Sequence, residues 1–262
     1  MAVAHLELSR ASGAWTVRAK SSRLVPVANE PESPAIVEAT ESAHDATIRW
    51  VTTPIGRTAV TWRADSARIV DTPLIDLILE VERRAAGADL ASTAAFSLDA
   101  TLDSGAITAA RLQALYPYDN TLRAIRISGG QLRAYLEQSA RYYLTSADGR
   151  PSVNADIPGY NFDIVSGVDY TLDLSRPAGQ RVTRLDYRGA PVTPTATFTM
   201  ALNNYRQTGG GGYAMLSGAP VVYDTQQEIR QLRSDEGRAR GTMAPADYFT
   251  RNWHIEPASA VG

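Results

Sequence analysis

The chain has 262 residues, a formal net charge of -2 and a hydrophobic share of 44%, which is enough to bury a substantial core. The near-neutral charge argues against binding to nucleic acid, because nucleic-acid-binding domains usually carry a clear basic excess. The sequence contains no cysteine, which excludes disulfides, cysteine-bound zinc and thiol catalysis. No apolar run reaches the roughly 18 residues of a membrane helix, so we expect no membrane partner.

The amino-terminal residues predict a small piece ahead of the main domain. His5 to Leu8 and Ala14 to Ala19 are typical of two short strands, joined by a turn at Ser12 and Gly13. The first ten residues lack the charged-then-apolar order of a signal peptide, so we expect either a cytoplasmic protein or a piece of a longer precursor. Lys20 is the only lysine beside many arginines, a codon usage that suggests a GC-rich bacterial genome.

A polar, proline-rich stretch from Asn29 to Pro34 is the best candidate for a linker. Pro34 suits a helix start, and Ala35 to Thr47 predicts a weakly buried helix because its residues are small and polar. Ile48 to Val51 predicts an extended segment.

The next helix has a clearer pattern. Thr72 is a candidate N-cap, Pro73 suits the first helical position and Gly87 can end the helix. Ala88 to Phe96 is small and apolar and predicts a buried strand with its loop. Thr108 to Leu115 predicts a short helix.

The pattern changes three times between Leu115 and Tyr143. Leu115 to Asn120 is an aromatic loop, and Thr121 to Ile127 alternates as a half-buried strand does. Ser128 to Gly130 predicts a turn, and the residues from Gln131 onward predict a helix by their apolar spacing. A loop mounted next to a strand and a helix is held rigidly, which suits recognition.

The second half of the chain mixes strands and turns without a regular alternation of strands and helices. We therefore predict an α+β fold with mixed or antiparallel sheets and packed helices. The expected elements are an irregular stretch over 150–158, strands over 168–174, 181–187 and 195–202, a turn over 176–180, a short helix over 226–233 and a mobile arginine-rich loop over 235–244.

Most familiar catalytic motifs are missing. The three histidines, His5, His44 and His254, lie far apart and form no metal-binding spacing. There is no G-x-S-x-G elbow, and the single lysine has no P-loop context. The four glycines from Gly209 to Gly212 could cradle a phosphate with backbone N–H groups, or they could form a flexible turn.

Two aromatic clusters are more informative. Tyr118 with Asn120, and Tyr205 beside Asn204 and the glycines, supply the groups that a nucleobase site needs. Two rings can sandwich a flat base, an Asn offers a donor and an acceptor, and glycines let a ligand approach the backbone. The alternative is that both tyrosines are ordinary half-buried core residues.

Three blocks, LYPYDNTL with GGQLRAYLEQSARYY, then GYNFDIVSGVDYTLDL, then ALNNYRQTGGGGY, resemble the C-terminal domain of the 5′-nucleotidase family. The resemblance covers about residues 30 to 256, and its closest branch is the bacterial 2′,3′-cyclic-nucleotide 2′-phosphodiesterase/3′-nucleotidases. It implies three parts. Residues 1–28 would be the closing strands of a missing N-terminal metallophosphoesterase domain, 29–50 a linker and connecting helix, and 51–262 a nucleotide-binding domain.

The resemblance also implies site residues. Tyr118 and Tyr205 match the family's two stacking aromatics, and Asn120 matches the Asn that follows the first of them. Where the 5′-nucleotidase branch has an Asp that holds the ribose, this chain has Gly211. Where that branch has an Arg after a Gly-rich strand, Ser92 to Ser97 contains none; both departures favour the cyclic-phosphodiesterase branch. The other candidates for the site are Asn204 and Gly210, with Asp119, Phe162, Asp163 and Arg206 as possible contributors.

The expected function is therefore that of a substrate-binding domain in a phosphohydrolase that acts on 2′,3′-cyclic nucleotides and 3′-nucleotides. Two divalent metal ions and the catalytic residues would belong to the N-terminal domain, so we expect this chain alone to be inactive and to hold no cofactor. By resemblance the parent protein would be periplasmic or extracellular. The alternatives are the substrate domain of a 5′-nucleotidase or UDP-sugar hydrolase, a stand-alone nucleoside-binding module, and a structural domain that has lost its ligand.

Overall fold

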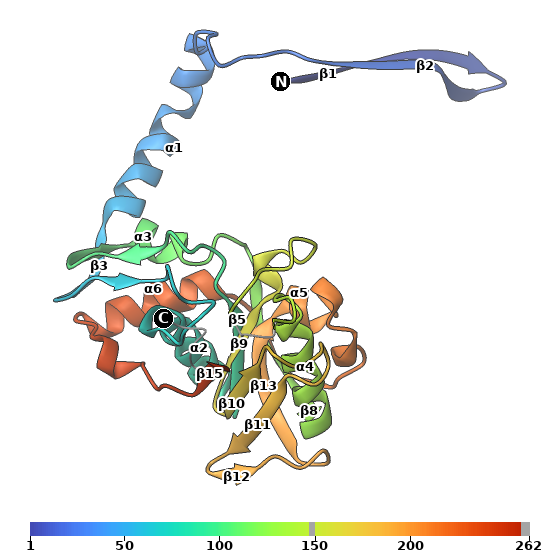
Figure 1. Cartoon of the computed structure of the whole chain (residues 1–262). Coiled ribbons are helices and arrows are strands. Elements are labelled where there is room, and N and C mark those ends of the chain that lie inside the picture. Colours follow the sequence, from blue (N-terminus) through green and yellow to red (C-terminus); the bar gives the residue numbers. More distant parts are fainter. Residues whose placement is uncertain (147–149, 258–262) are drawn as a thin grey trace. The chain divides into compact units, whose positions relative to one another are not determined.

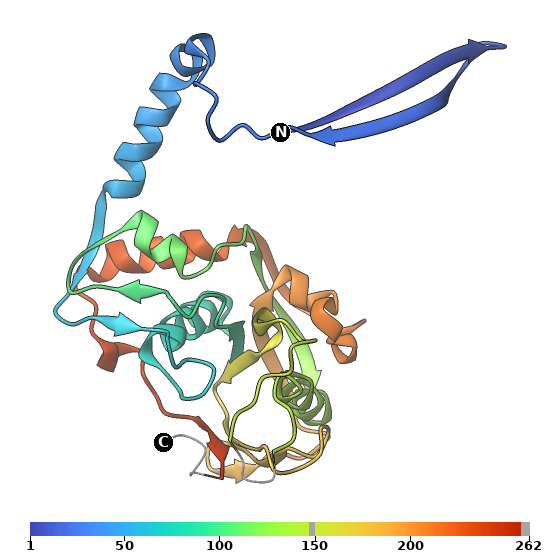
Figure 2. The same ribbon diagram turned by 45° about the horizontal axis from the view of Figure 1, so that its top comes forward.

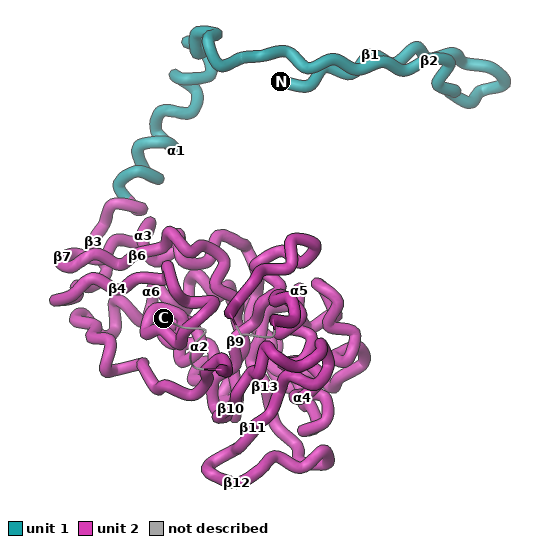
Figure 3. Tube along the Cα trace, viewed as in Figure 1, with its two compact units in different colours: residues 1–49 teal, residues 50–262 magenta. Residues whose placement is uncertain are grey.

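The computed structural model describes residues 1–146 and 150–257. The chain divides into two compact units, Met1–Arg49 and Trp50–Gly262 (Figure 3). This division falls one residue before the predicted start of the main domain. That residues 1–28 belong to another domain stays a prediction.

The first unit contains a long hairpin. Strands β1 (Ala2–Ala11) and β2 (Ala14–Leu24) pair antiparallel, with a register shift between Glu7 and Leu8. The turn has Ser12 at φ 54° and Gly13 at φ 84°, the positive values that a tight hairpin turn requires. The predicted hairpin is confirmed, with longer strands than expected.

Helix α1 (Pro34–Thr52) follows the hairpin and runs into the start of the second unit. The predicted extended segment over Ile48 to Val51 is wrong, because these residues are helical. Four residues are too few to separate a strand from a helix by periodicity. The first helix-breaking residue after Pro34 is Pro54, and the helix continues almost to it.

Two sheets form the centre of the second unit (Figure 1). The five-stranded sheet has the order β14-β8-β13-β5-β9, in which only the β13–β5 pair is parallel. The four-stranded sheet has the order β12-β11-β10-β15, in which β10 and β15 are parallel. Both sheets are mixed, so the predicted α+β class is confirmed. The strands are β5 (Leu90–Ala94), β8 (Thr121–Ser128), β9 (Asp163–Ser166), β10 (Asp169–Asp173), β11 (Val182–Tyr187), β12 (Ala190–Pro191), β13 (Thr197–Asn203), β14 (Val221–Glu228) and β15 (Trp253–Glu256).

Two strand pairs, five α-helices and four short 3-10 helices complete the described part of this unit. Helix α6 lies beside α3 and α2 in both ribbon views (Figures 1 and 2), and α2 also packs against β5. The pairs are β3 (Pro54–Thr58) with β7 (Gly105–Thr108) and β4 (Trp62–Arg63) with β6 (Thr101–Leu102). The α-helices longer than a single turn are α2 (Pro73–Ala86), α3 (Ala109–Ala114), α4 (Gly129–Ala140) and α6 (Ile229–Arg240).

The predicted bounds of α2 are confirmed. Pro73 is its first residue, and Gly87 follows its last residue in the left-handed conformation, φ 58°. The Gly87 N–H bonds back to the carbonyls of Arg83 and Arg84, as a C-terminal cap does. Thr72 stands at the N-cap, but its side chain makes no capping hydrogen bond.

The predicted turn over Ser128 to Gly130 is wrong, because α4 begins at Gly129. Ser128 is its N-cap: its hydroxyl accepts from the Gln131 N–H, and the Gln131 side chain accepts from the Ser128 N–H. This capping box starts the helix in spite of two glycines. Gly129 is needed because a Cβ there would collide with the carbonyl oxygen of Thr193.

The predicted loop over 235–244 is wrong for residues 235–240, since α6 starts at Ile229 and continues to Arg240; residues 241–244 lie outside the helix. Its sequence is polar almost all round, so it shows a weak apolar period. Ser234 and Gly237 are nevertheless buried, and a Cβ on Gly237 would lie 3.3 Å from the Ile55 carbonyl oxygen of β3. Tertiary contacts therefore keep as a helix a segment whose composition suggests a loop.

Candidate functional site

A cavity of about 300 Å³ opens beside the ends of β5, β8 and β13. Its lining is mostly aromatic and amide-bearing. The lining residues are Phe96, Tyr118, Asn120, Tyr160, Asn203, Tyr205 and Arg206. Four of the sequence candidates, Tyr118, Asn120, Tyr205 and Arg206, thus meet at one cavity.

The two candidate tyrosines and Tyr160 are the half-exposed rings of this cavity. Tyr118 is 45% exposed, Tyr205 48% and Tyr160 40%. Tyr118 lies in the loop before β8, and its ring meets Phe96 edge-on at 5.2 Å between centroids. Tyr205 belongs to the one-turn helix α5 (Asn204–Gln207) that follows β13. Large rings that are supported from behind and open in front can stack on a planar ligand.

Gly210 packs directly against the Tyr205 ring. A Cβ on Gly210 would lie 2.6 Å from ring atoms of Tyr205, so the ring rests directly on the glycine-rich turn. Gly211 has φ 74°, and a Cβ there would collide with the side chains of Arg206 and Asn161. The glycine run is therefore a packed turn that supports the aromatic wall.

Asn120 carries the polar group on the Tyr118 side. Its Nδ2 donates to the Tyr116 hydroxyl at 3.0 Å, and its backbone carbonyl accepts from the Ile229 N–H at 3.0 Å. Asn203, at the end of β13, accepts the Arg206 N–H on its Oδ1 at 2.7 Å and so caps α5. The cavity therefore combines two ring faces with two side-chain amides.

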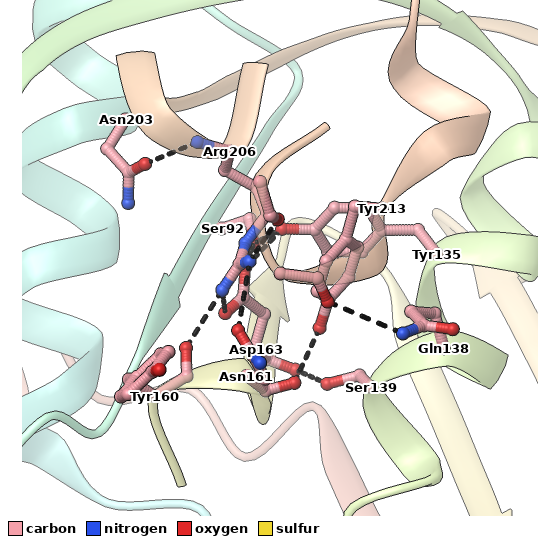
Figure 4. Close-up of polar contacts among 12 residues, drawn as sticks. Ser92, Tyr135, Gln138, Ser139, Tyr160, Asn161, Asp163, Asn203, Arg206 and Tyr213 are labelled. Atoms are coloured by element: carbon pink, nitrogen blue, oxygen red, sulfur yellow. Dashed lines mark hydrogen bonds and ion pairs between the residues drawn. The ribbon is translucent and has the colours of Figure 1, made fainter. Parts of the chain in front are cut away.

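Arg206 and Asp163 form a buried ion pair beneath this cavity (Figure 4). The guanidinium is 2% exposed and the carboxyl 3%. Arg206 Nη2 lies 2.7 Å from Asp163 Oδ1 and Nε lies 2.8 Å from Oδ2, the two-pronged geometry that Arg and carboxylates favour. Burial acts to lower the pKa of Arg206, but the charge of Asp163 outweighs it and the net shift is upward.

The same guanidinium holds two separate segments of the cavity wall. Arg206 Nη2 donates to the Tyr160 carbonyl at 2.8 Å, and Nη1 donates to the Gly210 carbonyl at 2.6 Å. Asp163 in turn accepts from the Tyr135 hydroxyl of α4 and from Ser92 of β5. Burial, followed by the charge of Asp163, raises the pKa of Tyr135, so its hydroxyl keeps its proton. Asp163 and Arg206 thus fix the shape of the wall from behind.

The remaining candidates lie outside the cavity lining. Asn204 is half-buried at the start of α5. Asp119 is exposed and pairs with Arg230 of α6 at 2.5 Å. Phe162 is buried in the core, with its ring 5.5 Å from Tyr142 and 6.0 Å from Trp253.

Four residues around the cavity were missed by sequence reasoning. Phe96, Tyr160 and Asn203 line it, and Tyr116 anchors Asn120. Asn203 directly precedes Asn204 and Tyr205, and Tyr160 stands in the block GYNFDIVSGVDYTLDL; these positions were the available signal. Phe96 follows a buried strand, where nothing local distinguishes a lining ring from a core ring.

Within residues 1–146 and 150–257 there is no group of three or more His, Cys, Asp or Glu side chains that could hold a metal ion. In that part of the chain, no helix is both long enough and apolar enough to cross a membrane.

Curated relatives match almost the whole chain. The 2′,3′-cyclic-nucleotide 2′-phosphodiesterase/3′-nucleotidases of Haemophilus influenzae and Salmonella typhimurium are 28% and 26% identical, over 98% of this chain and 46% and 47% of their own lengths. The trifunctional nucleotide phosphoesterase YfkN of Bacillus subtilis is 26% identical over 100% of this chain and 20% of its own length. The chain therefore spans less than half the length of these relatives.

Solved structures show the same fold. A crystal structure from Staphylococcus aureus, described as a 5′-nucleotidase in complex with alpha-ketoglutarate, has a TM-score of 0.75 and 27% identity and covers 97% of this chain and 50% of its own. A 5′-nucleotidase precursor from Thermus thermophilus has a TM-score of 0.68 at 22% identity, over 97% of this chain and 49% of its own.

The family model described as "5'-nucleotidase, C-terminal domain" matches residues 54–218, which is more than half of the chain. The resemblance that the three sequence blocks predicted is confirmed, and the chain belongs to the 5′-nucleotidase C-terminal domain family.

Proposed function

We propose that this chain is the substrate-binding domain of a phosphohydrolase that acts on 2′,3′-cyclic nucleotides and 3′-nucleotides, and that it stacks the base between Tyr118 and Tyr205. The supporting observation is that two half-exposed tyrosines from distant segments line one cavity together with Asn120. The named activity of the relatives from Haemophilus influenzae and Salmonella typhimurium supports the choice of substrate.

The residues of the cavity suit a nucleobase. Replacing a stacking aromatic side chain with alanine typically costs roughly 1–3 kcal/mol of binding free energy per base. The Tyr118 ring is supported by Phe96 and the Tyr205 ring by Gly210, so little side-chain freedom would be lost on binding. Asn120 lies beside the rings and can hydrogen-bond to the edge of the base.

The bond-breaking chemistry would come from an N-terminal metallophosphoesterase domain of the same parent protein, with two divalent metal ions to stabilise the developing charge on phosphorus. This chain would bind the nucleoside and orient its phosphate. Such positioning by itself can lower the activation barrier by several kcal/mol. The parent would act in the periplasm or outside the cell. Neither nucleic acid nor a membrane is proposed as a partner of this chain, whose net charge is -2.

Calorimetry with adenosine and 3′-AMP tests the proposed clamp. We expect Tyr118→Ala and Tyr205→Ala each to weaken binding about tenfold or more, because each removes one stacking face. Tyr223→Ala is the matched control, since Tyr223 is a partly buried tyrosine of β14 outside the cavity lining. Unchanged binding in both Tyr118→Ala and Tyr205→Ala would rule the clamp out. A further titration with 5′-AMP that gave tighter binding than 3′-AMP would favour the 5′-nucleotidase alternative.

A hydrolysis assay tests whether the catalytic groups lie outside this chain. The purified 262-residue chain should not hydrolyse 3′-AMP, with or without added divalent metal. An enzyme-like rate from this chain, free of contaminating phosphatase, would show that it carries its own catalytic groups.

A further inference from the structure

Tyr116 is buried next to the aromatic cavity, where its hydroxyl accepts from the Asn120 amide. We propose that Tyr116 is a positioning residue that sets the orientation of the Asn120 amide, so that the cavity presents a carbonyl oxygen. The cavity then prefers bases with an amino group at purine C6 or pyrimidine C4, adenine and cytosine, to their oxo counterparts hypoxanthine and uracil. This inference rests on the proposed function, since it concerns which base enters the same cavity.

The Tyr116 ring is held on several sides. It is 1% exposed, and its ring meets Phe96 edge-on at 4.6 Å between centroids. Arg233 belongs to α6, and its guanidinium carbon lies 5.3 Å from the Tyr116 ring centroid. Arg233 is itself held in place because it donates to the Leu112 carbonyl at 2.7 Å. The hydroxyl of Tyr116 therefore has a defined place beneath the cavity floor.

That hydroxyl takes the nitrogen end of the Asn120 amide. Asn120 Nδ2 donates to it at 3.0 Å. Burial and the nearby Glu82 carboxyl raise the pKa of Tyr116, so the hydroxyl stays a neutral phenol. With the nitrogen bound to Tyr116, the Asn120 Oδ1 is the end left for a ligand in the cavity that Asn120 lines.

The second amide of the lining does not offer an equivalent oxygen. Asn203 Oδ1 already accepts the Arg206 N–H at 2.7 Å, as Figure 4 shows. The Asn203 side chain also acts on the Tyr116 hydroxyl, where its hydrogen bond lowers the pKa of Tyr116. With Asn203 Oδ1 engaged by the Arg206 N–H, Asn120 Oδ1 is the amide oxygen of the lining that is left for a ligand.

An acceptor at the base edge discriminates by hydrogen bonding. An amino group of adenine or cytosine can donate to Asn120 Oδ1, whereas the oxo group of hypoxanthine or uracil would place two acceptors against each other. A site built for a hydrogen bond rejects an analogue that leaves its polar group unpaired. We expect adenosine to bind about tenfold more tightly than inosine, with purine riboside, which lacks the 6-substituent, between them.

Tyr116→Phe separates this orientation from stacking. The phenylalanine keeps the ring against Phe96 and Arg233 and removes only the hydroxyl, so the Asn120 amide becomes free to rotate. We expect the adenosine-to-inosine ratio of dissociation constants to fall from about tenfold to less than about threefold, mainly through tighter inosine binding. Tyr143→Phe is the matched control, because Tyr143 is a buried tyrosine outside the lining whose hydroxyl donates to the Arg68 carbonyl.

Calorimetry on the 262-residue chain with adenosine, inosine and purine riboside gives the ratios, and the melting temperature of each variant reports its folding. A ratio that falls in Tyr116→Phe but not in Tyr143→Phe supports the inference. An unchanged ratio in a folded Tyr116→Phe protein, or equal affinities for adenosine and inosine in the unmodified chain, would overturn it. Failure of all three nucleosides to bind would instead count against the proposed function itself.

Discussion

Asp163 and Arg206 show how much one buried pair can hold together. The pair joins α5 to β9, and Arg206 also holds the carbonyls of Tyr160 and Gly210. In a dry interior, removing one partner leaves an uncompensated charge, which is far more costly than losing an exposed ion pair. The tyrosine rings that would stack on a ligand therefore depend on a buried ion pair next to them.

The cost of breaking this pair can be measured. Asp163→Asn should lower the free energy of unfolding by about 3–5 kcal/mol, because the Arg206 charge would stay buried without its counter-ion. Urea denaturation measures the change. The double variant Asp163→Leu with Arg206→Met removes both charges and should recover much of the loss. A single variant within about 0.5 kcal/mol of the original chain would mean that water already reaches the pair.

At the scale of the elements, local patterns predicted those whose ends carry chemical signals. Pro73 and Gly87 bound α2 as expected, because they act on the backbone directly: Pro fixes φ and lacks an N–H, and Gly adopts a positive φ without a steric penalty. After Ser128, two glycines in the sequence predicted a turn, and this prediction was wrong. The capping box of Ser128 and Gln131 decides for a helix. Gly129 is present for a tertiary reason, the close passage of Thr193, which no local pattern shows.

The two glycines of α4 make a matched pair of substitutions. Gly129→Ala should destabilise the chain by about 2 kcal/mol, because its Cβ would collide with the Thr193 carbonyl and lie 2.7 Å from Val192 Cγ1. Gly130→Ala should be neutral or stabilising by up to about 1 kcal/mol, since the nearest atom to its Cβ is 3.5 Å away. Thermal unfolding compares the two. Equal melting temperatures for both variants would contradict the packing explanation.

At the scale of the whole molecule, buried carboxyls give the folding stability a pH dependence. Burial, with the charge of Asp71, raises the pKa of Asp76 to about 8, and burial raises the pKa of Asp71 to about 6. Between the pKa of the unfolded carboxyls and these values, the folded state holds protons that the unfolded chain has lost. Their contribution to stability is full below about pH 4 and is lost as the pH rises through 6 and then 8.

Asp76→Asn should therefore make the chain more stable at pH 8 by about 1–2 kcal/mol and flatten the decline between pH 5 and 8. An Asn oxygen can still accept the Thr250 N–H, which Asp76 Oδ2 accepts at 3.0 Å. Urea midpoints across this pH range measure the effect, with the exposed Asp156→Asn as control. A decline as steep in Asp76→Asn as in the original chain would assign the pH dependence to other groups.

The sequence by itself determined the fold class, the family and the identity of the clamp candidates. Tyr118, Asn120 and Tyr205 can be singled out from the sequence because they stand in segments of distinct composition. A strand, a loop and a glycine turn each have their own residue types. The tertiary structure decided which candidates meet: it brings Arg206 to the cavity, buries Phe162 in the core and pairs Asp119 with Arg230. It also added Phe96, Tyr160, Asn203 and Tyr116. The physical reason is that burial and side-chain hydrogen bonds join segments far apart in the chain, and no local period of the sequence records such contacts.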